Sequence, residues 1–102
     1  MGWKEVESLA SGKIIVKTDG NLVSFTISGT FACSTSATLT TLATCSSQYQ
    51  PLLYTETNYA VATNQWHSVY VTTTGVIKLY NNKQTNLNCD VCLISVLANP
   101  LQ

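Results

Sequence analysis

The sequence predicts an all-β protein, a single antiparallel sandwich or jelly-roll-like barrel of about seven or eight strands. Two observations support this. Short segments rich in β-branched and aromatic residues recur roughly every 8–12 residues with turn residues between them, and no segment has helical periodicity. A chain of 102 residues is the size of one domain, so we expect a single β domain over 1–102.

The first part of the chain predicts an edge strand and a hairpin. Residues 3–10 have the pattern of a short edge strand, and 1–11 as a whole are expected to form an N-terminal arm or edge strand continuing from a longer parent chain. A β-branched segment, 13–18, ends at Asp19-Gly20, the dipeptide that most strongly indicates a tight hairpin turn. In the return strand, 22–28, Val23, Phe25 and Ile27 alternate with serine and threonine, so they are predicted to share the buried face.

The rest of the chain predicts further short strands. Gly29 is expected to interrupt the return strand. Residues 34–51 predict a Ser/Thr-rich loop with a short strand near 38–44, in which Leu39 and Leu42 point inward. Four more strands are expected at 52–62, 66–73, 76–80 and 86–97.

Charge is scarce in this sequence and excludes some functions. Five lysines balance five acidic residues, there is no arginine, and only 10% of residues are charged, against about 25% in ordinary domains. Without a basic surface or bidentate arginine forks, a nucleic-acid partner is not expected. No apolar segment is long enough to insert into a membrane.

The charges are also unevenly placed. Between Asp19 and Lys78 the sole charged residue is Glu56, although exposed strands are usually protected by charge. Two explanations stay open: another copy of the chain covers this surface, or threonine, serine and asparagine alone keep it soluble. We expect the first, a homo-oligomer.

Four cysteines, Cys33, Cys45, Cys89 and Cys92, permit three interpretations: buried free thiols, one or two disulfides, or a metal site. Cys89 and Cys92 have C-x₂-C spacing, but residues three apart in a strand point to opposite faces and cannot both reach one metal. Free thiols are favoured, Cys33–Cys45 is the more plausible bridge, and no metal or other cofactor is expected.

The inventory of catalytic groups predicts a protein that is not an enzyme. There is one histidine, His67, and five carboxylates that are mostly far apart in sequence. No nucleophile elbow accompanies the histidine. We expect His67 to lie at the surface or in an interface.

The composition suits a neutral, polyhydroxylated ligand. Sugars are bound by amide and hydroxyl hydrogen bonds, with an aromatic ring stacked against the pyranose. The candidate ligand-binding residues are Trp66, His67, Asn64, Tyr59 and Asn58. The alternative for each is structural, because strand aromatics usually pack and asparagines usually form turns.

Three segments resemble a known family. They are 12–27, with its Gly-Lys start and Asp-Gly turn; 38–51, Thr38-Leu39-Thr40-Thr41-Leu42-Ala43-Thr44 running into Tyr49-Gln50-Pro51; and 66–80, which begins Trp66-His67-Ser68 and runs through Gly75 to Tyr80. Together they resemble the C-terminal β domains of tail-tip, baseplate and receptor-binding proteins of phages that infect Gram-positive bacteria. The sequence departs from the family pattern at Cys45-Ser46, where Leu-Pro is usual, and at Gln50, where arginine is usual.

The resemblance implies a function and partners. It implies a homotrimeric head that adheres to a host cell-wall saccharide, contacts other phage tail proteins, and is exposed outside the cell on the virion tail tip. Two alternatives stay open: a structural baseplate or tail-fibre module without a ligand, and a monomeric carbohydrate-binding module.

Overall fold

The computed structural model describes residues 2–32, 38–62, 65–81 and 86–101. Within them lie eight strands and two short 3₁₀ helices. The strands are β1 (Lys4–Leu9), β2 (Ile14–Thr18), β3 (Leu22–Ala32), β4 (Thr38–Thr44), β5 (Thr55–Ala62), β6 (Gln65–Val71), β7 (Val76–Asn81) and β8 (Asn86–Val96). The helices η1 (Ala10–Gly12) and η2 (Ser47–Tyr49) are one turn each, and no helix of the described residues has the length and apolar character needed to cross a membrane.

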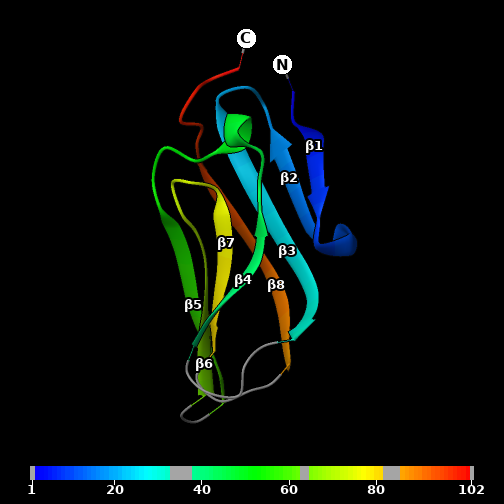
Figure 1. The fold of residues 1–102 in the computed structure, drawn as a ribbon, viewed down its shortest axis with the longest axis vertical. Coiled ribbons are helices and arrows are strands. Elements are labelled where there is room, and N and C mark those ends of the chain that lie inside the picture. The colour runs from blue at the N-terminus through cyan, green and yellow to red at the C-terminus, as the bar shows by residue number, and fades with distance from the viewer. Residues whose placement is uncertain (1, 33–37, 63–64, 82–85, 102) are drawn as a thin grey trace.

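The strands form two four-stranded antiparallel sheets packed face to face (Figure 1). Sheet A has the order β1-β2-β3-β8, and sheet B has the order β4-β7-β6-β5. In sheet B, β5, β6 and β7 follow one another as hairpins while β4 lies beside β7, which is a Greek-key arrangement. The predicted antiparallel sandwich of seven or eight strands is therefore confirmed.

The hairpin of β2 and β3 is built as the sequence predicts. The Asp19 carboxylate accepts hydrogen bonds from the backbone N–H groups of Asn21 (2.9 Å) and Leu22 (2.8 Å). These bonds lower the pKa of Asp19, chiefly through Leu22. An aspartate that caps its own turn in this way fixes where β3 begins.

The longest pairing joins β3 to β8 over eleven residue pairs, from Leu22↔Val96 to Ala32↔Asn86. The expected break at Gly29 is wrong, because Gly29 stays in register opposite Cys89 with a φ of 127°. The aliphatic part of Lys13 covers the place where a Gly29 side chain would stand, and its Nζ donates to the Thr30 carbonyl at 2.6 Å.

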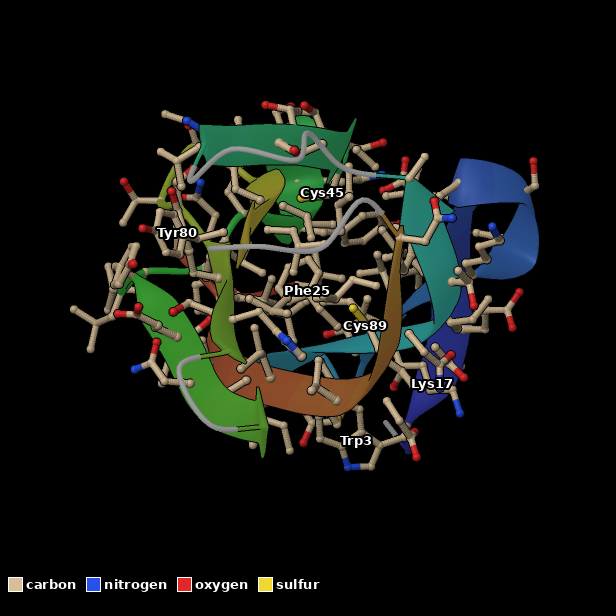
Figure 2. All side chains as sticks on the ribbon, turned by 90° about the horizontal axis from the view of Figure 1, so that it is seen from below. Trp3, Lys17, Phe25, Cys45, Tyr80 and Cys89 are labelled. Atoms are coloured by element: carbon tan, nitrogen blue, oxygen red, sulfur yellow. The ribbon has the colours of Figure 1, made fainter. Side chains whose placement is uncertain are left out.

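The core lies between the sheets and is made by alternate strand residues. Val23, Phe25 and Ile27 of β3 are fully buried, as predicted, and Phe25 lies near the centre of the end-on view (Figure 2). Sheet B contributes Val69, Val71, Ile77 and Leu79, also with no exposed surface. Residues of this kind contribute about 1.5–3 kcal/mol each by burial.

One predicted core residue of β4 is misplaced. Leu42 is partly buried against the core, but Leu39 is 54% exposed. The pairing of β4 with β7 shifts between Thr41 and Ala43. This β-bulge changes which residues face inward, so Leu39 and Leu42 do not act as a matched pair of anchors.

The edge strand β1 is tied to both sheets. It pairs with β2 in sheet A with a register shift between Glu5 and Glu7. The Glu7 carboxylate then accepts two hydrogen bonds from Ser46, just after β4 in sheet B, from the backbone N–H at 2.9 Å and from Oγ at 2.7 Å. A bulge together with charge is a usual protection of an exposed sheet edge.

The hairpin turn between β6 and β7 leaves no room for a side chain at Gly75. Its φ is +80°, and an added Cβ would lie 2.6 Å from Cys45 Sγ and 3.3 Å from Gln50 Cγ. Gly12 also has a left-handed φ of +88° but has open space around it. A substitution at Gly12 therefore tests backbone strain alone, whereas one at Gly75 tests backbone strain together with steric overlap.

We expect Gly75→Ala to lower the free energy of unfolding by about 3 kcal/mol, from left-handed strain plus overpacking. Gly12→Ala, which adds strain alone, is expected to cost about 1 kcal/mol. Urea unfolding followed by fluorescence measures both. In a Cys45→Ala background, the cost of Gly75→Ala should fall towards that of Gly12→Ala. Equal losses for the two glycine variants in the wild-type background would contradict the steric account.

Candidate functional site

The predicted site residues lie on the paired strands β5 and β6. Tyr59 pairs with His67, Asn58 pairs with Ser68, and Trp66 stands opposite Ala60. The fold thus brings four of the five predicted residues to one hairpin. Asn64 lies outside the described residues, and for Tyr59 and Trp66 the description covers the backbone only.

His67 is buried within the single chain, which corrects the expectation of a surface or interface histidine. Its side chain is 1% exposed, and it alternates with Ser68, which belongs to the outer side of sheet B. Burial lowers the pKa of His67, so the ring is neutral at pH 7. In the single chain, His67 is therefore part of the interior and does not share a surface with Asn58.

Asn58 is exposed and has a fixed neighbour. Ser68 Oγ donates a hydrogen bond to Asn58 Oδ1 across the β5–β6 pairing. Because its carbonyl oxygen accepts this bond, the Asn58 amide is oriented with its NH₂ group free to donate elsewhere. Asn58 is the predicted site residue whose side chain the structure places at the surface.

Two tyrosines form a pair next to Asn58. The ring centroids of Tyr54 and Tyr70 are 5.3 Å apart with an interplanar angle of 42°, within the range that aromatic pairs prefer. Tyr54 is 50% exposed and Tyr70 is partly buried. The contact restricts both rings, so an apolar ring surface is presented to solvent in a defined orientation.

Glu56 lies beside this pair and changes its ionisation. Desolvation raises the pKa of Tyr54, and the Glu56 charge and a hydrogen bond to the Glu56 carboxylate raise it further. The pKa of Tyr70 is also raised, first by desolvation and then by the Glu56 charge. Both hydroxyls therefore remain protonated, and able to donate hydrogen bonds, across the physiological pH range.

Strand register assembles these residues into two rows across sheet B. One row is Glu56↔Tyr70↔Lys78↔Thr41, and the next is Asn58↔Ser68↔Tyr80↔Leu39. We call the outer side formed by these rows, with Tyr54, the tyrosine face. Tyr80 is labelled on the outer side of sheet B in Figure 2, away from Phe25 and Cys89 in the interior.

Of this face, sequence reasoning named Asn58 as a site residue and missed the others, among them Tyr70 and Glu56. A signal was present, because Ser68 and Tyr70 alternate with the valines at 69 and 71 and therefore share a side of the strand. What the sequence did not provide was the pairing that sets Tyr70 between Glu56 and Lys78.

The structure does not form the Cys33–Cys45 bridge, one of the interpretations that the sequence permits. Cys45 is a buried free thiol, so it is not bonded to Cys33, which lies outside the described residues. Burial, followed by the charge of Glu7, raises the pKa of Cys45 to about 11, which makes this thiol unreactive at neutral pH. Cys89 is buried and Cys92 is exposed, so the C-x₂-C pair points to opposite faces as predicted.

The described residues enclose no pocket and hold no group of three or more His, Cys, Asp or Glu side chains able to bind a metal ion. No known protein family, curated protein or solved structure matches the chain.

We expect Glu56→Gln to lower the pKa values of Tyr54 and Tyr70, because the carboxylate charge that opposes tyrosinate formation is removed. Tyrosinate absorbance during an alkaline titration should then appear at lower pH than in the wild type. Glu5→Gln, on sheet A, serves as the control and should leave the titration unchanged. An identical curve for Glu56→Gln would contradict the described geometry.

Proposed function

We propose that this chain is a non-enzymatic receptor-binding head domain of the phage tail-tip type, which attaches as a homotrimer to a host cell-surface saccharide. The observation that carries the proposal is the tyrosine face. It combines one half-exposed and two partly buried tyrosine rings with amide, hydroxyl, carboxylate and ammonium groups, and its two charges, Glu56 and Lys78, sum to zero among the described residues. Such a surface suits an uncharged polyol.

The sequence resemblance and the sandwich fold support the same assignment. Many head domains per virion would let weak contacts act together, since linked sites raise the overall affinity without new contacts. A deep pocket is then unnecessary. The proposal therefore fits an adhesin with an open binding surface.

A second surface supports self-association. Leu52, Leu53, Ile94 and Val96 are 44–63% exposed, and we call them the apolar patch. Their backbones lie close together, because the Leu52 N–H donates to the Val96 carbonyl at 2.7 Å and Ser95 Oγ donates to the Leu53 carbonyl at 3.4 Å, and Ile94 and Val96 share the exposed side of β8. Exposed apolar clusters of this kind commonly mark protein–protein contacts.

The apolar patch also favours a second candidate, a structural baseplate or tail-fibre module that holds neighbouring subunits without binding a ligand. The two candidates share the trimer and differ in whether host cell wall is bound. A monomeric carbohydrate-binding module is the reverse of the structural module, because it would bind sugar without assembling into a trimer.

We expect the wild-type chain to sediment as a trimer at micromolar concentration and to be retained by cell walls of a Gram-positive host. Ile94→Lys should shift sedimentation to the monomer, because a charge in a buried interface is costly. Asn88→Lys lies on the outer face of the same strand outside the apolar patch and is the matched control. A monomeric wild type contradicts the trimer, and a trimer that cell walls do not retain favours the structural module.

A further inference from the structure

We infer that the tyrosine face is the ligand-binding surface, and that it takes a linear, neutral polysaccharide lying across the strands rather than a terminal sugar held in a pocket. This inference rests on the proposed adhesin function and names where and how the saccharide binds. It differs from the site predicted around Trp66, although it keeps Asn58 from that prediction.

The first step concerns the rings. Tyr54 and Tyr70 contact each other with centroids 5.3 Å apart, and Tyr54 keeps half of its surface exposed. Tyr80 lies one strand and one row away from Tyr70, a diagonal spacing of about 7–8 Å. Aromatic surface is thus distributed over three positions, one just before β5 and two in β6 and β7, which matches a ligand with repeated apolar faces rather than a single ring.

The second step concerns the hydrogen-bonding groups between the rings. Asn58 has its acceptor oxygen engaged by Ser68, which leaves its NH₂ group to donate. Glu56 supplies acceptor oxygens, and Lys78, opposite Tyr70, supplies a donor. Hydroxyl groups of a sugar both donate and accept, so a surface with both kinds of group can satisfy them.

The third step concerns shape. The described residues enclose no pocket, so any one sugar unit would be contacted on one side only. Each unit then contributes little, and useful affinity requires several units bound together. An open face of this kind therefore favours several consecutive units of a polysaccharide over a single terminal sugar.

Among the described residues, the outer face of sheet A carries no pair of contacting aromatic rings. It carries the row Glu5↔Lys17↔Ser24↔Ile94 and the exposed Asp90. Its exposed aromatic ring is Trp3, at 47%, which lies on the outer side of that sheet in Figure 2. Trp3 is therefore a natural control for an exposed ring that does not belong to the proposed surface.

The experiment uses the full chain and a series of linear neutral hexose oligosaccharides, from disaccharide to hexasaccharide, with the purified cell-wall polysaccharide of a Gram-positive host. Affinity is measured by titration calorimetry, and the binding surface is mapped by amide chemical-shift changes in the wild type. We expect affinity to rise at least about tenfold along the series, with shifts concentrated on β5, β6 and β7.

The variants locate the site. Tyr54→Ala and Tyr70→Ala should each weaken binding by about tenfold or more, and Tyr54→Phe should retain most of it, because the stacking surface remains. Trp3→Ala should leave affinity unchanged. Thermal unfolding of each variant checks the fold, and the wild-type shift map locates the site without any substitution.

The outcomes separate the two proposals. If the wild type binds neither the oligosaccharides nor the cell-wall polysaccharide, the proposed adhesin function fails and this inference fails with it. If the wild type binds, but Trp66→Ala abolishes binding while the tyrosine variants do not weaken it, adhesion stands and the inferred surface is wrong. The surface is also wrong if Tyr70→Ala changes the oligomeric state instead of the affinity, since the tyrosine face is then an interface between copies.

Discussion

The fold depends on the apolar interior that the two sheets share. Phe25 and Ile27 from sheet A meet Val69, Ile77 and Leu79 from sheet B, all fully buried. Because side chains alternate along a strand, committing these residues to the interior fixes which residues face outward, and a one-residue slip would reverse them. The tyrosine face is thus a consequence of core packing. Tyr70 is outside because Val69 and Val71 are inside.

The strands of this fold were largely predictable, because alternation and the Asp-Gly turn are local signals. The failures arose where local signals are ambiguous. Leu39 belongs to a threonine-rich strand with a β-bulge, and a bulge has no clear sequence signature. Gly29 resembled a strand end, yet the long β8 partner holds it in register. For His67, the sequence showed that inward and outward residues alternate along the strand, but it did not show whether His67 or its neighbours point inward.

The candidate site was harder to predict than the fold for a related reason. Asn58 was found because it is a polar residue near aromatic ones. The rows that join Glu56, Tyr70 and Lys78 come from three strands, and register between strands is a non-local property that no single segment encodes. In the sequence, the scarcity of charge between Asp19 and Lys78 was an indication that such a surface exists. In the fold, that stretch supplies all of β3 and, in sheet B, all of β4, β5 and β6.

The link between Glu7 and Ser46 has a mechanical consequence. Both ends of the chain lie at the same end of the long axis, and β1 runs along that axis (Figure 1). A pulling force that enters through the N-terminal side therefore acts along β1, and the hydrogen bonds to β2 share the load in shear instead of opening one after another. The two bonds from Ser46 to Glu7 pass part of that load to the opposite sheet. An edge strand anchored at two places fits the adhesin function proposed above, in which the domain is loaded through its attachment.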